Sequence, residues 1–425
     1  MHDLDLSKIN TSEILSARKI FFIGIGGIGI SAIARMMHLE GKEVSGSDIS
    51  QNQIVEELKK LGIKVITGQD FDLIPKGTEL IVYTLAIPHY DKKLFEQVVN
   101  SGIPYKSYPQ MLGIVTEGKN TIAIAGTHGK TTTTAMIAKI LIDAGRDPSV
   151  VVGSLLKDYQ SNFIMGKSDL FVVEACEYER SFLNLKPKIL VITNIEAEHL
   201  DYYKDLTDIQ SAFDQLISQS EKVISDYSKY LSKVPKLLVP GEHNRKDAAA
   251  ALAVADLLGI KEEIAQKALA EFTGTWRRLE KRGETAEGAI IYDDYAHHPT
   301  EIKASLQGLR ELYPRGEMKI TVLFQPHLYS RTKALFEDFA KCFDGADRVF
   351  LLPIYFAREA IDESISSEKL AEAITRAGQN ARAFSGFEEA EAHIKAMNLG
   401  PNDVFVTMGA GEAYKVADKV FGFDQ

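Results

Sequence analysis

Short apolar runs alternate with amphipathic stretches along the first part of the chain. The run Lys19–Ile23 is followed by a helix-like pattern at Ser31–Glu40 and by a second short strand that ends at Asp48. The alternation continues through a helix at 51–61, strands at 63–66 and 79–84, and a helix at 91–101. Apolar strands separated by helices are typical of a parallel sheet that is covered on both faces. We therefore predict a first Rossmann-like α/β domain, residues 1–107.

The same alternation starts again at Thr121–Ala125, an apolar run that leads through a glycine turn into a helical pattern at Thr132–Ala144. Further strands are expected at Asp169–Glu174 and Ile189–Asn194, and helices at Asp208–Ser218, Asp247–Leu258 and Lys261–Glu271. A strand, a glycine turn and a helix in this order are typical of P-loop ATPases. We predict a central domain of this type with a parallel sheet, residues 108–280.

Four more strand patterns follow, at Ala289–Tyr292, Met318–Phe324, Arg348–Leu352 and Asp403–Thr407. Polar residues or glycines come directly after each of them. The carboxyl ends of strands in an open parallel sheet face the ligand crevice, so these loops are expected to form a site. The pattern predicts a C-terminal Rossmann-like domain, residues 281–425, and an α/β chain of three domains in all.

The composition agrees with three globular domains and argues against nucleic acid as a partner. A length of 425 residues suits about three domains, and 45% hydrophobic and 25% charged residues are ordinary for globular proteins. The net charge of −10 argues against a broad basic field for nucleic acid. Cys176 and Cys342 form no zinc motif and suit a reducing cytoplasm. No signal peptide and no apolar run of about 18 residues is found, so we expect a cytoplasmic protein without a membrane span.

The glycine turn of the central domain has the residues that are typical of a phosphate-binding loop. Its residues are Gly126, Thr127, His128, Gly129, Lys130, Thr131 and Thr132. Backbone N–H groups of such a turn cradle a polyphosphate, the lysine reaches the β- and γ-phosphates, and the hydroxyl that follows is suited to ligate Mg²⁺. Ile124 stands where the strict pattern has glycine. The turn predicts an ATP site, and the alternative is a surface turn with a solvated lysine.

A second glycine motif, GIGGIG at 24–29, opens the first predicted helix. Gly24, Gly26, Gly27 and Gly29 follow a strand, and Asp48 ends the next strand about 20 residues further on. Such glycines let the backbone approach a diphosphate, and the acid accepts ribose hydroxyls. We interpret the motif as a nucleotide site, with a purely structural turn as the alternative.

Two candidate metal ligands lie at neighbouring strand ends of the central domain. Glu174 ends one strand, and His199 follows the next. Either residue alone would be interpreted as a capping or surface residue, but their positions favour a metal site. Cys176 has no histidine partner and is interpreted as a packing thiol.

The third domain gathers acids, phenols and imidazoles at two strand ends, in the runs 293–300 and 325–331. The adjacent histidines lack the helical spacing of a zinc motif. Trp276 is interpreted as a packing residue, and Arg277 and Arg278 as partners of a phosphate or ribose, or as part of a solvated turn.

Taken together, these motifs resemble those of the Mur ligases, in the same order and over nearly the whole chain. The matching segments are GIGGIGISAIA with SGSD, AGTHGKTTTT, EACEYERSFL, TNIEAEHLD, GEHN, TWRR, DDYAHHPTEI, FQPHLYSRT and IYFAREA. DDYAHHPTEI followed by FQPHLYSRT is most similar to the branch that adds L-alanine to UDP-N-acetylmuramate. The resemblance implies an ATP-dependent ligase of peptidoglycan precursor synthesis that works through an acyl phosphate and releases ADP and phosphate.

The resemblance also implies roles for individual residues. The GIGGIG glycines would approach the diphosphate of the sugar nucleotide, with Asp48 near the nucleoside. Thr131 and Glu174 would ligate one Mg²⁺, and His199 a second metal, for which a histidine ligand makes Mn²⁺ an option. Asn244, Arg278 and Asp294 would lie around the adenosine and phosphates, and Tyr295, His297, His327 and Arg331 in the amino-acid pocket. The catalytic set implied is Lys130, Glu174, His199, His297 and Arg331.

Three features depart from the family pattern. Asp247 replaces an asparagine of the HNxxN motif, and Leu328 replaces an arginine of the HRYxR form, a loss for which Arg358 is expected to compensate. The segment between His199 and His243 is short, so the central domain is expected to be trimmed.

Three other functions stay open. A sister ligase that adds a peptide to UDP-N-acetylmuramate would share the motifs. An NAD-dependent oxidoreductase would use the GIGGIG motif and leave the central loop without a role. A non-catalytic nucleotide-binding regulator is compatible with Asp247 and Leu328. The partners expected in the favoured case are UDP-N-acetylmuramate, ATP and L-alanine, without nucleic acid.

Overall fold

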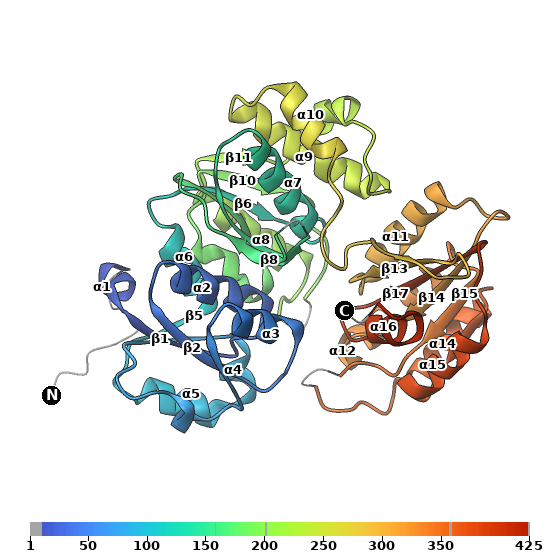
Figure 1. Cartoon of the computed structure of the whole chain (residues 1–425), viewed down its shortest axis with the longest axis horizontal. Helices are drawn as coiled ribbons and strands as arrows, with labels where there is room; N and C mark the ends of the chain where they lie inside the picture. Colours follow the sequence, from blue (N-terminus) through green and yellow to red (C-terminus); the bar gives the residue numbers. More distant parts are fainter. Residues whose placement is uncertain (1–10, 158, 200–201, 357–358, 424–425) are drawn as a thin grey trace. The chain divides into compact units, whose positions relative to one another are not determined.

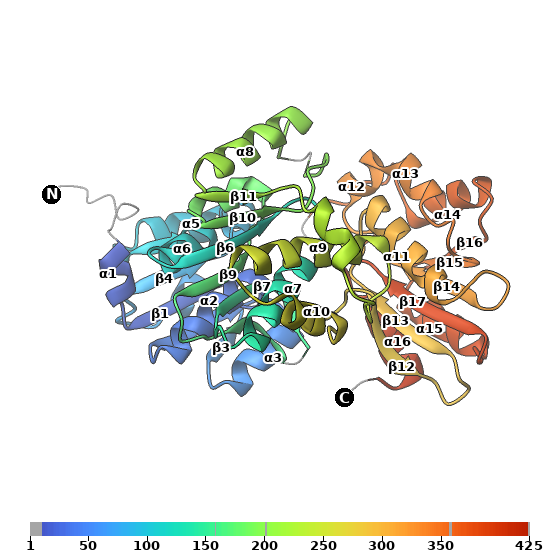
Figure 2. The same ribbon diagram turned by 90° about the horizontal axis from the view of Figure 1, so that it is seen from above.

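Three mainly parallel β-sheets flanked by helices make up the protein (Figures 1 and 2). The computed structural model describes residues 11–157, 159–199, 202–356 and 359–423. The chain divides into two compact units, one formed by residues 1–235 with 247–269 and the other by residues 236–246 with 270–425. The first unit contains two of the sheets and the second unit contains the third. The predicted α/β fold is confirmed.

Sheet A is five-stranded and fully parallel, with the order β3-β2-β1-β4-β5 of a Rossmann-like sheet. Its strands are β1 Lys19–Ile23, β2 Glu43–Asp48, β3 Lys64–Thr67, β4 Leu80–Tyr83 and β5 Tyr105–Ser107. Its helices are α1 Thr11–Ser16, α2 Ile28–Leu39, α3 Gln53–Lys60, α4 Ala86–Tyr90, α5 Lys92–Val99 and α6 Tyr108–Thr116, with a 3-10 turn at Phe71–Leu73. Phe21 and Phe22 point to opposite faces of β1, and both are fully buried because helices cover both faces.

Sheet B has the order β11-β10-β6-β9-β7-β8 and is parallel except for β8, which runs antiparallel to β7. Its strands are β6 Asn120–Ala125, β7 Ser149–Leu156, β8 Ser161–Ile164, β9 Leu170–Glu174, β10 Ile189–Ile192 and β11 Lys222–Ile224. The helices that follow them are α7 Lys130–Asp143, α8 Leu206–Ser218, α9 Glu242–Leu257 and α10 Glu262–Ala270, with 3-10 turns at Tyr178–Asn184 and Ser228–Lys233. The β7–β8 hairpin was not predicted, and it contacts α2 of the neighbouring sheet within the first unit.

Sheet C has the order β12-β13-β17-β14-β15-β16, with only β12 antiparallel to its neighbour. Its strands are β12 Glu280–Glu284, β13 Ile290–Asp294, β14 Lys319–Phe324, β15 Arg348–Leu351, β16 Ala381–Ala383 and β17 Asp403–Met408. Its helices are α11 Pro299–Leu312, α12 Tyr329–Ala334, α13 Phe336–Lys341, α14 Ser367–Arg376, α15 Phe387–Ala396 and α16 Tyr414–Phe421. Side chains of α11, α13 and α14 form the core on one face, and those of α15 and α16 form the core on the other.

Two predicted element boundaries are wrong in ways that matter for the site. Helix α9 begins at Glu242 rather than Asp247, because Gly241 takes a φ of +103° just before it and an acidic first residue suits a helix N-terminus. Strand β13 continues through Asp293 and Asp294. Asp293 tolerates this burial because it pairs with the Arg277 guanidinium at 2.8 Å and accepts a hydrogen bond from Thr407 at 2.6 Å.

No helix in the described part of the chain is both long enough and apolar enough to cross a lipid bilayer.

Candidate functional site

The glycine turn after β6 has the shape of a phosphate-binding loop. Gly126 and Gly129 have φ values of +141° and +80°, which few other residues adopt. Gly129 is the N-cap of α7, so the loop ends at a helix N-terminus with its N–H groups and positive dipole end. Thr131 and Thr132 lie in the first turn of α7, which begins two residues before the predicted start.

Hydrogen bonds to the segment after β10 hold this loop in place. The Thr127 hydroxyl accepts from the Glu196 N–H at 2.8 Å, and the His128 N–H donates to Asn194 Oδ1 at 2.9 Å. The Thr193 hydroxyl donates to the His128 carbonyl at 2.5 Å. The loop shape is therefore set by the neighbouring strand end as well as by its own glycines.

Lys130 is folded over the loop and onto a buried carboxylate. Its Nζ donates to the carbonyls of Gly126 and Thr127 at 2.5 and 3.0 Å and to Glu177 Oε1 at 3.1 Å. Burial alone would lower the pKa of Lys130, but the surrounding carboxylates, above all Glu177, raise it above its ordinary value. The ammonium is therefore charged at neutral pH, as a phosphate-binding lysine must be.

Glu174 and Thr131, for which the family resemblance implies a shared metal, meet beside the loop. The Thr131 hydroxyl donates to Glu174 Oε2 at 2.9 Å, and the Gly153 N–H donates to the same oxygen at 2.7 Å. A hydroxyl and a carboxylate are the hard oxygen donors that Mg²⁺ prefers. These two residues fit that ion.

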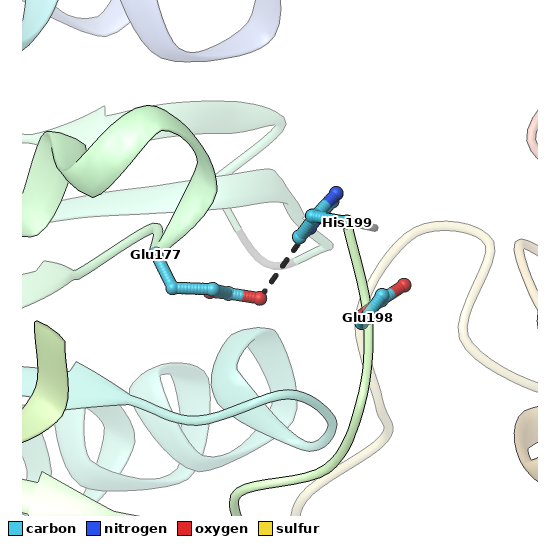
Figure 3. Close-up of side chains that lie close together, drawn as sticks. All are labelled: Glu177, Glu198 and His199. Carbon is cyan, nitrogen blue, oxygen red and sulfur yellow. Dashed lines mark ion pairs between the residues drawn. The ribbon is translucent and has the colours of Figure 1, made fainter. Parts of the chain in front are cut away.

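A second group of ligand atoms contains His199 together with two acids that the sequence analysis missed. Ligand atoms of Glu177, Glu198 and His199 all lie within 4.8 Å of one another (Figure 3). His199 Nε2 lies 3.5 Å from Glu177 Oε1, and the histidine backbone has a φ of +55°. Glu177 is three residues after Glu174 and Glu198 precedes His199, so their place in the same strand-end loops was the available signal.

The charge state of Glu177 depends on its neighbours. Burial alone would raise the pKa of this carboxyl, but the Lys130 ammonium and the hydrogen bond from His199 lower it below its ordinary value. The ring of Tyr178 packs against the ring of His199, with the two centroids 4.9 Å apart. Glu177 is thus an ionised carboxylate shared by a lysine and a histidine.

The GIGGIG motif forms the turn between β1 and α2, with Gly27 as the N-cap of the helix. The Gly24 N–H donates to the Ser47 carbonyl at 2.8 Å, and the Gly26 N–H donates to Asp48 Oδ2 at 2.8 Å. Asp48 Oδ1 accepts from the N–H and hydroxyl of Ser50 at 2.9 and 2.7 Å. The buried Asp48 therefore shapes the loop, and its role at the nucleoside stays a prediction.

In the second unit, the four residues predicted for the amino-acid pocket lie together. The rings of Tyr295 and His297 have centroids 5.4 Å apart, and those of His297 and His327 6.2 Å apart. Arg331 Nη1 lies 3.2 Å from His327 Nδ1, and Tyr355 stacks on His327 at 5.5 Å. Burial lowers the pKa of His297 to about 3 and that of His327 to about 4, so both imidazoles are neutral at pH 7.

Leu328 lies beside this cluster in an unusual conformation. It is the N-cap of α12 with a φ of +71°, which is costly for a residue with a branched side chain. Its N–H donates to the Tyr355 carbonyl at 2.8 Å, which ties the loop to the neighbouring strand end. Arg358, the residue expected to compensate for Leu328, lies outside the described residues.

The remaining predicted ATP residues also belong to the second unit, whereas the phosphate loop belongs to the first. The Arg278 guanidinium lies 5.2 Å from the Tyr295 ring centroid. Burial raises the pKa of the nearby Asp294 to about 6, against the opposing effects of Ser305 and Arg278. Asn244 lies in the first turn of α9 and donates to the Pro240 carbonyl at 2.6 Å.

Asp247, which replaces an asparagine of the HNxxN motif, packs directly on the phosphate loop. A Cβ added to Gly129 would lie only 2.4 Å from Asp247 Oδ1, and the aspartate is buried. The glycine at 129 is therefore required by this close approach as well as by its φ.

Comparison with known proteins matches all three parts of the chain. Residues 19–120 match the family model described as Mur ligase family, catalytic domain; residues 124–231 match the Mur ligase middle domain; and residues 277–411 match the Mur ligase, glutamate ligase domain. The UDP-N-acetylmuramate–L-alanine ligase of Agathobacter rectalis is 39% identical, with 94% of this chain and 96% of the relative aligned. That of Desulfosudis oleivorans is 38% identical, with 96% and 98% aligned.

Solved structures agree with these sequence matches. The UDP-N-acetylmuramate-alanine ligase of Thermotoga maritima has a TM-score of 0.81 at 28% identity and covers 95% of this chain and 98% of its own. A murein peptide ligase of Psychrobacter arcticus has a TM-score of 0.67 at 22% identity, which shows a shared fold. Because identity well above 30% extends over nearly the full length of both chains, the protein belongs to the Mur ligase family.

Proposed function

We propose that this enzyme joins L-alanine to the lactyl carboxylate of UDP-N-acetylmuramate, with conversion of ATP to ADP and phosphate. The observation that carries the assignment is the full-length similarity, at 34–39% identity, to relatives named UDP-N-acetylmuramate–L-alanine ligase. The phosphate loop with Lys130, Glu174 and Glu177 supports the use of ATP. The solved peptide-adding ligase at 22% identity supports only a common fold.

Each sheet is proposed to serve one substrate. In this division residues 1–107 bind the sugar nucleotide, residues 108–280 bind ATP and residues 281–425 bind the amino acid. The GIGGIG turn, the phosphate loop and the Tyr295–Arg331 cluster support the three assignments in turn. A small-molecule ligase with few cysteines and these substrates is expected to work in the cytoplasm.

The donor sets also support two divalent cations. Thr131 and Glu174 would hold Mg²⁺, and Glu177, Glu198 and His199 would hold a second ion, for which the imidazole makes Mn²⁺ acceptable. Such ions would offset the negative charge of the ATP phosphates.

In the first step an oxygen of the lactyl carboxylate attacks the γ-phosphorus of ATP, the bond to the bridging oxygen breaks, and ADP leaves. Negative charge on the phosphoryl oxygens must be offset as they rearrange. The Lys130 ammonium is held charged over the phosphate loop by the Gly126 and Thr127 carbonyls and by Glu177, so it is placed to supply this offset. The product is an acyl phosphate, which is a far better acylating agent than the carboxylate.

In the second step the amine of L-alanine attacks the acyl carbon, and phosphate leaves from a tetrahedral intermediate. Arg331 would pair with the α-carboxylate of the amino acid. His297 Nδ1 faces the Tyr295 carbonyl at 3.0 Å, so a neutral ring donates there and presents Nε2 as an acceptor for the substrate ammonium or amine. The pocket thereby binds both ends of an α-amino acid.

A phosphate-release assay tests the proposal. The enzyme is incubated with ATP, MgCl₂, UDP-N-acetylmuramate and either alanine, glycine or serine, and each component is omitted in turn. We expect release that needs all three substrates and is fastest with alanine. Release supported by a tripeptide and not by alanine would favour the sister ligase. A change in nicotinamide absorbance without phosphate release would favour an oxidoreductase, and nucleotide binding without turnover would favour a regulator.

A further inference from the structure

A tyrosine outside the predicted sites lies between the GIGGIG turn and the end of β9. Tyr108 is the first residue of α6 and follows β5 directly. Its backbone is fixed by a capping box, in which Ser107 and Gln110 bond to each other's backbone N–H groups, and by Pro109 in the first turn. The phenol therefore projects from a rigid position.

One edge of the Tyr108 ring packs against Gly29 in the first turn of α2. A Cβ added to Gly29 would lie 2.6 Å from Tyr108 Cζ and 2.8 Å from its hydroxyl oxygen. Only glycine leaves room for this contact. The hydroxyl is thus placed beside the helix N-terminus where N–H groups and the helix dipole favour an anion.

Tyr108 also lies within electrostatic range of Glu174 and Cys176, at the end of β9 in sheet B. Burial is the main reason that the pKa of Tyr108 is raised above its ordinary value, and the nearby Cys176 and Glu174 raise it further. The phenol therefore keeps its proton at every physiological pH and can act as a hydrogen-bond donor. Tyr108 adjoins both the turn predicted to bind the diphosphate and the carboxylate predicted to bind metal.

The Tyr108 hydroxyl forms no hydrogen bond with any residue in the described ranges of the chain. Glu174 accepts hydrogen bonds from Thr131 and Gly153 instead. The phenol can therefore donate to a ligand atom without first breaking a bond within the protein, and a bond to a charged acceptor would add affinity.

We propose that Tyr108 binds the sugar nucleotide by donating a hydrogen bond to its diphosphate. The inference rests on the proposed function, because it takes UDP-N-acetylmuramate as the ligand of the GIGGIG turn. An anionic oxygen held by the first turn of α2 is the acceptor that the position of this hydroxyl fits, and a bond to a charged group is among the stronger kinds.

The test is the substitution Tyr108→Phe, which removes the hydroxyl and keeps the ring that packs on Gly29. Binding of UDP-N-acetylmuramate, of UDP alone and of a non-hydrolysable ATP analogue is measured by calorimetry on the full chain. We expect the first two to weaken by about tenfold or more and the third to stay unchanged. In turnover, the KM for the sugar nucleotide should rise while the KM for ATP does not.

Tyr105→Phe is the matched control, because this tyrosine lies three residues away and its ring packs on Tyr83 in the apolar core of sheet A. It should leave all three affinities unchanged. Unaltered UDP affinity in Tyr108→Phe would overturn the proposal, even if UDP-N-acetylmuramate bound more weakly, since the contact would then be to the sugar. Wild-type protein that failed to bind UDP-N-acetylmuramate at all would instead refute the proposed function.

Discussion

At the residue scale, Lys130 is the side chain on which phosphoryl transfer depends in this account. Lys130→Ala removes the charge that offsets the phosphoryl oxygens and should lower kcat by about a hundredfold or more. The affinity for UDP-N-acetylmuramate should not change, because that ligand is assigned to sheet A. Lys139→Ala is the control, since Lys139 lies on the same helix and pairs with Asp143 four residues further along it. Near-normal turnover of Lys130→Ala would refute the assignment of this loop to ATP.

A substitution of Glu177 tests whether Glu177, Glu198 and His199 bind a metal ion. Glu177→Gln keeps the size of the side chain but removes the charge that Lys130 and His199 share. We expect the concentration of Mn²⁺ that gives half-maximal activity to rise at least about tenfold. Glu179→Gln, two residues further on and paired with His89 instead, should leave it unchanged. Equal metal dependence in the two variants would contradict the role given to Glu177.

Substitutions of Arg331 and Leu328 test whether this loop binds the amino acid. Arg331→Ala should raise the KM for alanine by about tenfold or more, because a charge-assisted bond to the α-carboxylate is lost. Leu328→Arg should lower that KM with little effect on the KM for ATP, since the positive φ at this position is equally unfavourable for both residues. Lys333→Ala, in the same helix and exposed, serves as the control. An unchanged alanine KM in Arg331→Ala would mean that this loop is not the amino-acid site.

Several of these residues could be predicted from the sequence, and others could not. Lys130, Thr131 and Glu174 were predictable because a phosphate loop and a strand end fix them within one sheet. Glu177 and Glu198 were missed because their contribution depends on two loops folding toward each other, which spacing along the chain does not encode. Tyr108 was missed because its packing on Gly29 joins two helices, α2 and α6, that are far apart in the sequence.

At the scale of elements, the β7–β8 hairpin links sheet B to the GIGGIG helix. Asn162 of β8 is fully buried, and its amide donates to the Ile28 carbonyl and, at 2.8 Å, to the Ser31 hydroxyl. Asn162→Ala should destabilise this contact by about 1–3 kcal/mol, because both hydrogen bonds from the buried amide to α2 are lost. Hydrogen exchange in α2 should accelerate, whereas exchange in sheet C should not. Unaltered protection in α2 would show that the hairpin does not hold the helix.

Most apolar strands of four or more residues were predicted, whereas the three-residue strands and the β7–β8 hairpin were not. The strand Lys19–Ile23 was predicted residue for residue, because a run buried on both faces leaves a continuous apolar signal. Strands β5, β11 and β16 are only three residues long and carry too little pattern. The β7–β8 hairpin was missed because its burial comes partly from α2, an element of another sheet.

At the scale of the molecule, the second unit is expected to lose stability in acid. Burial lowers the folded-state pKa of His243 to about 4, of His297 to about 3 and of His327 to about 4. Between pH 6.5 and about 4 the unfolded chain therefore binds more protons, and each histidine lowers the free energy of unfolding by about 1.4 kcal/mol per pH unit as the pH falls. Asp294, with a raised pKa of about 6, has the opposite effect below that pH and offsets only part of the loss.

The single tryptophan reports on this effect, because Trp276 lies in the second unit. Urea titrations followed by its fluorescence should show a lower midpoint at pH 5 than at pH 7. His243→Asn should recover about 2 kcal/mol of the difference. His89→Asn, in the first unit, should recover none. A pH-independent midpoint in the wild type would contradict the buried neutral histidines.

The order of the three sheets was predictable because each begins with its own motif. The grouping of sheets A and B into one compact unit was not, since it rests on contacts between the sheets, such as those of Asn162 with α2 and of α6 with the turn at Tyr178–Asn184. The assignment of one substrate to each sheet remains a proposal.

The most direct test of the central claim follows oxygen from substrate to product. UDP-N-acetylmuramate carrying ¹⁸O in both oxygens of its lactyl carboxylate is incubated with the enzyme, ATP, MgCl₂ and L-alanine, and the products are analysed by mass spectrometry. We expect UDP-N-acetylmuramoyl-L-alanine that keeps one ¹⁸O in its new amide, and one ¹⁸O in each phosphate released. Product formed with unlabelled phosphate would contradict an acyl-phosphate route, and labelled sugar nucleotide recovered without alanine attached would contradict the function itself.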